Sequence, residues 1–384
     1  TGEPRRTPGT RMIFHMNAPA SAVPITGMGA VTPIGVGLEA FRAGLRRGDS
    51  GVALLDFSHP RMKSTVAAAC RGFDPRSVMP AAELARVPRL VPMAIAAATE
   101  AATNAGLFGP EGRVHPGLAG RTAIVLGTGG GGIDFTLMQA EHVHNDRPAS
   151  LWTITNATHG NLAGEISIAL GARGPSQCVS TGCASSSDAV GVARDLLLSA
   201  RPGAPDIAIV VGADAHIRWE TLSGMELLRV ISVRNWRDQT ALAHTASRPF
   251  DADRDGFVLG EGAWAVVMER REIAAKREVA PLAHVRGYAA TCDAYHRVRP
   301  DPEMTESIRA MRLAMEDAGV RPEEIGLAHL HGTATKMNDV VETRAVRATF
   351  GDHADRLQCT SVKSMIGHPQ GAGGVAALVA TLAG

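Results

Sequence analysis

The 384-residue chain carries little charge and almost no net charge. Only 20% of its residues are charged, and 39 basic against 38 acidic side chains leave a formal net charge of +1. A nucleic-acid-binding surface needs an excess of basic residues, so the composition gives no support to a nucleic-acid partner. Hydrophobic residues make up 45% of the chain, which excludes a disordered protein and predicts a large buried core.

The chain also has no apolar run close to the ~18 residues that a membrane helix requires, so we expect no membrane association. Its first residues do not show the charged region, apolar core and cleavage site of a secretory signal. Residues 1–20 are interpreted as a leader or tag, with a natural start at Met12 or Met16, and are excluded from the predicted fold.

Cysteine is sparse, and the odd number of scattered residues argues against a disulfide framework. We therefore expect a reducing compartment, the cytoplasm. Cys178 and Cys183 have the wrong separation for a paired metal-ligand motif and no second pair follows, so we expect no metal site. The five cysteines are Cys70, Cys178, Cys183, Cys292 and Cys359.

The residues that are abundant indicate an α/β enzyme. Forty-two glycines suit many tight strand-to-helix turns. From Val23 onward, short apolar runs alternate with amphipathic stretches, which is typical of βαβ units around a buried sheet. The first series of predicted strands lies at 122–127, 177–180, 206–215 and 263–270, and a weaker series lies at 282–290, 327–332 and 360–364.

This repetition predicts two similar halves, residues 21–275 and residues 276–384. In the first half, two more strands follow the helix that begins after Cys183, whereas in the second half the chain stops at GGVAALVATLAG. We therefore expect the second half to lack its last strands.

Cys183, in the segment VSTGCASSS, is the candidate nucleophile. Apolar residues at helical spacing follow it, so the thiol is predicted to stand at a helix N-terminus, where the dipole favours thiolate. A free cysteine is more often a small buried hydrophobe. The small neighbours Gly182, Ala184 and 185–187 favour the catalytic interpretation, because they leave room for a substrate.

Two histidines are expected to reach the same crevice as Cys183. His331 and His368 each follow a predicted strand and lie beside glycine, and loops at the carboxyl ends of strands are where sites form in open α/β sheets. Lys363 lies in the same segment as His368. Other histidines are interpreted as surface or core residues, namely His15, His142, His159, His216 and His353.

Four motifs together resemble a known family. They are VSTGCASS around Cys183, SRPFDADRDGFVLGEGA at 247–263, HGTATKMND from His331 and SVKSMIGHPQGAGG from Ser361. In this order they are similar to β-ketoacyl-[acyl carrier protein] synthases, the condensing enzymes of fatty acid and polyketide assembly. STGC at 180–183 and TKMNDVVET are closest to ketosynthase subunits of type II polyketide systems.

The resemblance implies an α/β fold, a thiolase-like five-layer αβαβα sandwich of two similar halves, and a dimer. Family members continue beyond residue 384 with closing strands and a Gly-Phe-Gly-Gly loop that donates an oxyanion N–H, so that loop is expected to be missing from this chain. No bound cofactor is implied, because the substrates arrive on the phosphopantetheine arm of an acyl carrier protein.

The family's reaction assigns roles to particular residues. Cys183 would take the growing acyl chain, and His331 and His368 would hydrogen-bond the malonyl thioester carbonyl during decarboxylation, which gives a β-ketoacyl product. Lys363 would hold His331 in place, and Glu342 would pair with Lys363, although a purely structural ion pair is an equal alternative. The substrate-binding candidates are Thr333 and Thr335 for the pantetheine arm, Phe250 as a tunnel-lining residue, and Gly130.

Gly130 stands where fatty acid synthases of the family carry a bulky aliphatic gate. We therefore expect a wider or more branching acyl pocket here, and Gly130→Ile should shorten the acyl chains that the protein accepts.

Two alternatives remain open at this point, and two others are disfavoured. The protein could elongate fatty acids rather than polyketides, and it could be one subunit of a heterodimer with a chain-length partner. The non-catalytic partner itself is disfavoured, because such subunits lack the nucleophile. A thiolase needs a second cysteine as acid and base, and only Cys359 is available for that role.

Overall fold

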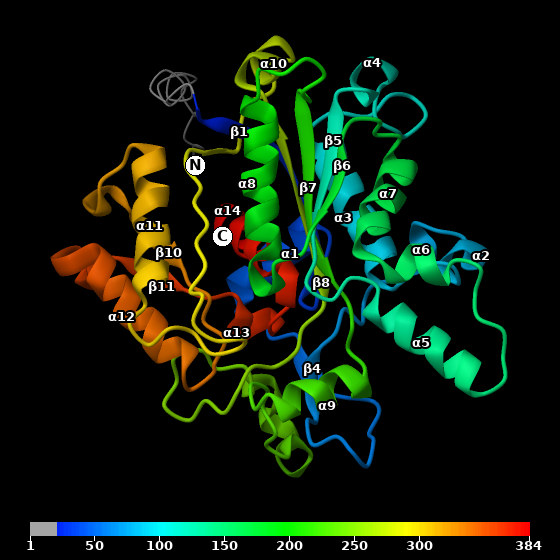
Figure 1. Ribbon diagram of the computed structural model, residues 1–384, viewed down its shortest axis with the longest axis vertical. Helices are drawn as coiled ribbons and strands as arrows, with labels where there is room; N and C mark the ends of the chain where they lie inside the picture. The colour runs from blue at the N-terminus through cyan, green and yellow to red at the C-terminus, as the bar shows by residue number, and fades with distance from the viewer. Residues whose placement is uncertain (1–20) are drawn as a thin grey trace, which may run out of the picture.

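The computed structural model describes residues 21–384, and its helices and sheets stack in alternating layers (Figure 1). Two helices form the first layer, a small sheet the second, two buried helices the third, a large sheet the fourth and two further helices the fifth. In chain order, the helices of these layers are α3 (Leu90–Asn104), α7 (His159–Leu170), α8 (Ser185–Leu198), α11 (Thr305–Ala318), α12 (Asn338–Phe350) and α14 (Gly373–Ala383).

The large sheet has the strand order β2-β1-β8-β7-β5-β6, with β9 paired to β1. Strands β7, β5 and β6 run parallel, whereas β8 is antiparallel to both β7 and β1. The carboxyl ends of the three parallel strands therefore meet at one edge of the sheet. The bounds are β1 (Val23–Thr32), β2 (Gly35–Val36), β5 (Thr122–Gly127), β6 (Ser176–Val179), β7 (Ile207–Asp214), β8 (Gly262–Glu269) and β9 (Ala283–Val285).

Both faces of this sheet are buried, which explains its nearly continuous apolar strands. Along β7, Ile207 and Ile209 point toward α3 and α7, whereas Ala208 and Val210 point toward α8 and α14. Glycine lets α3 approach closely, because a Cβ on Gly29 would lie 2.1 Å from the carbonyl oxygen of Ala97.

The second sheet contains two parallel strands, β10 (Leu327–His329) and β11 (Gln358–Thr360). Met315 of α11 and Phe350 of α12 pack against it on one side, and α14 contacts β10 on the other. The sequence predicted a strand of the second half at 282–290. Within this range Ala283–Val285 form a strand, β9, which pairs with β1 of the large sheet and not with β10 or β11.

The remaining elements surround these layers. None of the helices between residues 21 and 384 has the length and apolarity that a bilayer crossing requires. The leader predicted for residues 1–20 lies outside the described residues. The peripheral elements are α1 (Leu38–Arg47), α2 (Ala81–Leu84), α4 (Pro116–Ala119), α5 (Ile133–His144), α6 (Thr153–Ala157), α9 (Trp219–Leu227), α10 (Arg271–Lys276), α13 (Lys363–Ile366), β3 (Val52–Leu54) and β4 (Val66–Ala68).

Candidate active site

The loops that follow β5, β6 and β7 converge at the carboxyl edge of the large sheet, as expected for parallel neighbours. A buried carboxylate, that of Asp214 at the end of β7, binds the loop that follows β5. It accepts hydrogen bonds from the Thr128 hydroxyl at 2.7 Å and from the backbone N–H groups of Gly129 at 2.8 Å and Gly130 at 2.9 Å. It also accepts from the Gly371 N–H at 2.7 Å, which fixes the loop after His368 to the same point.

Cys183 lies in a short 3₁₀ turn, Gly182–Ala184, directly before α8, so its predicted place at a helix start is confirmed. Gly182 has a φ of +64°, a conformation that glycine adopts without strain. Ser185 closes the turn, because its hydroxyl accepts from the Thr181 N–H at 2.9 Å and donates to the Gly182 carbonyl at 2.5 Å.

A second contact ties this turn to the second half of the chain. Asp188, in the first turn of α8, accepts a hydrogen bond from the Thr181 hydroxyl at 2.5 Å and from the Tyr288 phenol at 2.7 Å. The ring of Tyr288 packs against Gly191, where a Cβ would come within 2.3 Å of it. Burial, followed by the hydrogen bond to Asp188, raises the pKa of Tyr288.

His331 and His368 both reach the thiol, as the sequence predicted. His368 Nε2 lies 3.2 Å from Cys183 Sγ, and the two imidazoles meet edge to face with centroids 5.3 Å apart. His368 is buried and its backbone is fixed to the loop before β8, since its N–H donates to the Val258 carbonyl at 2.7 Å. His331 follows β10.

The ionisation of Cys183 differs from our expectation. We predicted a helix N-terminus that favours thiolate, but burial raises the pKa of Cys183, and the Asp214 carboxylate adds to the rise. The Lys363 ammonium and the turn's own N–H oppose it without reversing it. Helix-terminus effects are typically below about 1 kcal/mol, and desolvation of a charge costs more. The resting pair is therefore a thiol beside a neutral imidazole.

Both histidines are neutral at pH 7. Burial lowers the pKa of His368 well below its usual range, and the Lys363 cation and His331 lower it further. Desolvation and the same cation also lower the pKa of His331. Each ring therefore carries one N–H that can be donated to a substrate oxygen.

The neutral state of His368 predicts a dependence of stability on pH. The unfolded chain protonates this residue near pH 6.5, whereas the folded protein does not, so the unfolded state binds more protons below that pH. The free energy of unfolding should therefore fall as pH drops below 6.5, by about 1.4 kcal/mol per pH unit from this residue. Urea denaturation between pH 7 and pH 5 measures it.

His368→Gln should remove that share of the slope, and His144→Gln, at an exposed position near the end of α5, should leave the slope as it is. A wild-type slope that persists in His368→Gln would contradict the assignment.

Lys363 is buried at the start of α13, and burial lowers its pKa to about 8. The predicted pairing of Glu342 with Lys363 is wrong as a direct contact, because no ion pair joins them among residues 21–384. Glu342 instead accepts hydrogen bonds from the backbone N–H of His331 at 2.5 Å and of Gly332 at 2.8 Å. Its carboxylate raises the pKa of Lys363 only as a nearby charge. Glu342 therefore positions the His331 loop.

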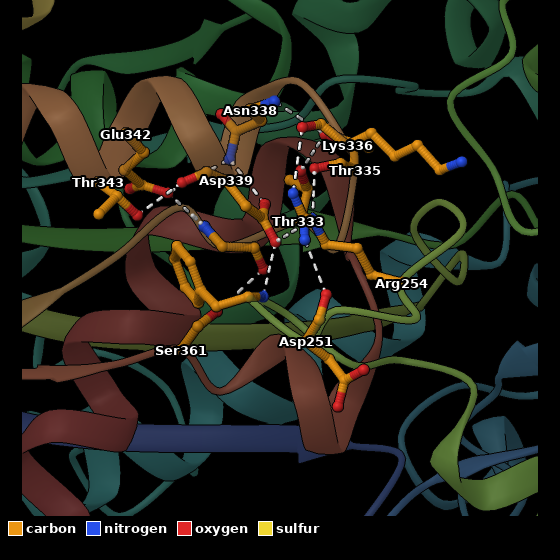
Figure 2. Close-up of polar contacts among 12 residues, drawn as sticks. Asp251, Arg254, Thr333, Thr335, Lys336, Asn338, Asp339, Glu342, Thr343 and Ser361 are labelled. Atoms are coloured by element: carbon orange, nitrogen blue, oxygen red, sulfur yellow. Dashed lines mark hydrogen bonds and ion pairs between the residues drawn. The ribbon is translucent and has the colours of Figure 1, made fainter.

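Thr333 and Thr335 lie on the loop between β10 and α12, close to Asp339 (Figure 2). The hydroxyls of Thr333 and Thr335 are 3.1 Å apart. Asp339, buried at the start of α12, accepts the Phe250 N–H at 2.7 Å and lies 3.6 Å from Nε of Arg254. These contacts fix Phe250 in a left-handed conformation, with a φ of +64°.

The Phe250 side chain lines a cavity of about 480 Å³. Cys359, the only candidate for the second cysteine of a thiolase, lines this cavity and is not part of the Cys183 cluster. The arrangement therefore gives no support to a thiolase.

Gly130 does not leave the open space that we expected. A Cβ at this position would lie 2.4 Å from Nδ1 and 2.6 Å from Cε1 of His216. The ring of His216 fills the volume that a side chain at position 130 would have taken. Gly130 therefore does not widen the pocket at this position, contrary to our prediction.

Sequence reasoning missed four residues that shape the site. Asp214 was not considered, although an acid that ends a long apolar strand is unusual enough to notice. His329 accepts the Val362 N–H at 3.0 Å, and burial, with Lys363, lowers its pKa to about 4. The Gln370 side-chain oxygen lies 3.7 Å from Cys183 Sγ. His216 was interpreted as an ordinary surface or core histidine.

The cluster has the donor set of a metal site, although we predicted none. Ligand atoms of Cys183, His331 and His368 all lie within 4.8 Å of one another. His368 Nδ1 has no hydrogen-bond partner among the described residues, whereas metal-bound histidines usually donate their other N–H. The same geometry also fits a nucleophilic thiol that is assisted by two imidazoles.

Comparison with known proteins identifies the family. A model of the β-ketoacyl synthase N-terminal domain matches residues 20–274, and one of the C-terminal domain matches residues 282–383. The chain belongs to the β-ketoacyl synthase family. A 3-oxoacyl-[acyl-carrier-protein] synthase 2 from Synechocystis sp. is 34% identical over 369 residues, which cover 95% of this chain and 86% of that relative.

Solved β-ketoacyl synthases have the same fold. One from Burkholderia phymatum STM815 has a TM-score of 0.82 and 28% identity, and the match covers 94% of this chain and 85% of that one. The ishigamide ketosynthase/chain length factor has a TM-score of 0.80 and 30% identity, with the same coverage. The thiolase-like five-layer αβαβα fold predicted from the sequence is therefore confirmed.

Proposed function

We propose that this β-ketoacyl synthase extends an acyl chain held on Cys183 by decarboxylative Claisen condensation with malonyl-[acyl carrier protein]. One observation carries the proposal. A thiol at the start of α8 lies 3.2 Å from a neutral imidazole, which in turn meets a second neutral imidazole, and all three groups stand at converging loops.

In the first half-reaction, Cys183 Sγ attacks the thioester carbonyl of the acyl chain on the carrier. His368 Nε2 accepts the thiol proton as the new S–C bond forms and passes it to the departing pantetheine sulfur. The backbone N–H of Cys183 is the proposed donor that stabilises the oxyanion. Because the pKa of Cys183 is raised and that of His368 is lowered, the proton moves during attack and not before it.

In the second half-reaction, with the neutral ring of His368 in the tautomer that carries its proton on Nε2, the N–H groups of His331 and His368 bind the malonyl thioester oxygen. Cleavage of the bond to the carboxylate releases carbon dioxide and leaves its electron pair as an enolate, which the two donors stabilise. The enolate carbon attacks the Cys183 thioester, and the thiolate leaves with a β-ketoacyl product on the carrier. Lys363, a buried cation near both sulfur and imidazoles, offsets the charge that develops.

The substrates would arrive on the phosphopantetheine arm of an acyl carrier protein, so the reaction needs no bound cofactor. The Thr333 and Thr335 hydroxyls are the proposed contacts for that arm. Scattered cysteines, all free within residues 21–384, support the cytoplasm as the location.

Polyketide assembly is the proposed pathway, and fatty acid elongation is the alternative. The motifs STGC and TKMNDVVET and the 30% identity to the ishigamide ketosynthase/chain length factor favour polyketides. The 34% identity to a 3-oxoacyl-[acyl-carrier-protein] synthase 2 favours fatty acids.

We propose that β6 is the pairing edge of a homodimer, or of a heterodimer with a ketosynthase-like chain-length subunit. β6 is the last strand of the large sheet, and its Ser176 and Gln177 are exposed. Large apolar side chains are also exposed on nearby segments, among them Leu151 at 88% and Ile154 at 76%. An open edge and exposed apolar groups are features that pairing would cover.

The function is tested by incubating the purified protein with an acyl carrier protein that bears an acyl chain, and then with malonyl-[acyl carrier protein]. Intact mass should show the chain on the protein first and the extended β-ketoacyl product on the carrier afterwards. Cys183→Ala should reduce both by about 10³-fold or more.

Cys292→Ala is the matched control, because it removes an exposed thiol that lies outside the cluster, and it should leave both steps unchanged. His331→Ala should give the acyl-protein without the extended product. Condensation that survives in Cys183→Ala would overturn the proposal.

A further inference from the structure

The cavity of about 480 Å³ borders the side chains that support the His331 loop. Phe250 and Ser361 line it, and both pack against the residue that follows His331. A Cβ on Gly332 would lie 2.7 Å from Cβ of Ser361 and 2.9 Å from Cε2 of Phe250. The Ser361 hydroxyl also donates to the Gly332 carbonyl at 3.2 Å. A ligand in this cavity would therefore touch the groups on which the loop rests.

This cavity is separate from the candidate active site. None of the three reacting side chains, the Cys183 thiol and the two imidazoles, lines it. The proposed contacts for the pantetheine arm, Thr333 and Thr335, do not line it either. Its volume falls in the range of about 300–1,000 Å³ that is usual for small-molecule sites. The cavity is therefore a candidate site for a second ligand.

The lining combines apolar surface with hydroxyl groups. Phe250, Leu330 and Val346 contribute apolar surface, whereas Thr343 and Thr360 contribute hydroxyls. Within residues 21–384 the Thr360 hydroxyl makes no hydrogen bond, so it can donate one to a ligand. A wholly apolar ligand would cover these hydroxyls without pairing them, which is unfavourable. The lining therefore suits a ligand with an apolar body and a polar end.

A single cation gives the cavity its charge. Among residues 21–384, Arg347 is the only charged residue that lines it, on the same face of α12 as Thr343 (Figure 2). Arg347 Nη1 lies 3.0 Å from Oδ1 of Asp355, and these two side chains are 66% and 72% exposed. An exposed ion pair of this kind contributes little, so the guanidinium can turn to another anion. Its planar pair of donors matches a carboxylate.

We propose that this cavity binds a free carboxylic acid with an apolar chain, with the carboxylate on Arg347 and the chain against Phe250 and Leu330. The binding site does not depend on the proposed condensing function.

The effect of such a ligand on catalysis does rest on the proposed function. In the second half-reaction the malonyl thioester has to enter between the two imidazoles. A ligand in the cavity removes the room into which Phe250 and Ser361 could shift as the His331 loop adjusts, because close-packed groups transmit strain. A bound acid should therefore slow condensation and leave acylation of Cys183 unchanged.

Binding is tested through Cys359, whose thiol lines the cavity. The purified protein is treated with iodoacetamide with and without octanoate, and alkylation is followed by peptide mass at Cys359 and at Cys292. An octanoate concentration ten times the dissociation constant should slow alkylation of Cys359 by about tenfold. Cys292, which is exposed and does not line the cavity, should react at an unchanged rate. Octanoate that leaves the rate at Cys359 unchanged would overturn the proposal.

The contribution of the carboxylate is measured with variants and with an uncharged ligand. Arg347→Gln should raise the octanoate concentration that half-protects Cys359 by about tenfold, because a charge-assisted hydrogen bond is lost. Octan-1-ol, which has the same chain without the charge, should also need about tenfold more. Arg344→Gln is the matched control, since Arg344 is exposed on α12 and does not line the cavity. Equal protection in wild type and Arg347→Gln would overturn the assignment of a carboxylate.

The effect on catalysis is measured in the two-step assay with carrier proteins. Octanoate at the concentration that protects Cys359 should slow formation of the extended product by about tenfold in wild type, and much less in Arg347→Gln. Protection without slower condensation would overturn the action on His331 and leave the binding site. Acylation of Cys183 slowed equally in both proteins would show that octanoate acts in the acyl pocket, which also overturns that action. A protein that forms no product would contradict the proposed function, and protection of Cys359 would still decide whether the cavity binds the acid.

Discussion

Asp214→Ala is expected to lower the free energy of unfolding by about 3–5 kcal/mol, which is large for a single substitution. The carboxylate is fully buried and accepts hydrogen bonds from one hydroxyl and three backbone N–H groups. Alanine would leave all four donors in the interior without a partner. Urea denaturation followed by circular dichroism measures the loss.

The same substitution should slow acylation of Cys183 by about 100-fold or more, because Asp214 joins the first glycine-rich loop to the loop that follows His368. We attribute this loss of acylation rate to displacement of the loops around Cys183 and not to a change in the ionisation of Cys183. The charge of Asp214 raises the pKa of Cys183, so its removal favours thiolate, and alkylation by iodoacetamide should not slow in step with acylation.

Asp352→Ala, at an exposed position, should change stability by less than about 0.5 kcal/mol. An Asp214→Ala protein as stable as this control would show that the four donors find other partners.

Gly127→Ala is expected to cost about 1–3 kcal/mol and to slow acylation of Cys183 by about 100-fold. A Cβ on Gly127, at the end of β5, would lie 2.4 Å from Cα and 2.6 Å from the backbone nitrogen of Ser186. These are backbone atoms at the start of α8, so the helix has to move, and the turn that holds Cys183 would move with it. Stability and acylation are measured as for Asp214.

Gly224→Ala is the matched control. Gly224 is exposed inside α9, and a Cβ there would meet nothing within 4 Å. Alanine should stabilise this helix by about 0.5–1 kcal/mol and leave acylation unchanged. If Gly127→Ala behaved like Gly224→Ala, close packing of α8 on β5 would not be what positions the nucleophile.

The sequence predicted the strands that are buried on both faces. Residues 122–127 coincide with β5, and residues 206–215 contain β7, because a continuous apolar run bounded by polar residues has few alternatives. It also predicted that Cys183, His331 and His368 would meet. Strand ends and glycine-rich loops constrain where those side chains can lie. The resemblance of the motifs to a known family supplied the roles of the three residues.

The sequence could not predict contacts between loops that lie far apart in the chain. Asp214 binds Gly129 across 85 positions, and Glu342 binds backbone N–H groups instead of Lys363. The spacing of apolar residues indicates which face of a helix or strand is buried. It contains no information on which backbone N–H will donate a hydrogen bond to a given carboxylate. The same limit applies to His216, whose packing against Gly130 depends on how closely two loops approach.

The contact of Tyr288 with Asp188 gives the protein an intrinsic spectroscopic probe. The chain contains only two tyrosines, and the other, Tyr295, is exposed. A phenol ordinarily ionises near pH 10 and changes its near-ultraviolet absorbance when it does. Because the pKa of Tyr288 is raised while its hydroxyl is held against α8, its absorbance change is delayed for as long as that contact lasts. An alkaline titration of the native protein, followed by tyrosine absorbance, therefore reports whether Tyr288 of the second half still contacts Asp188 of α8. No added label is needed.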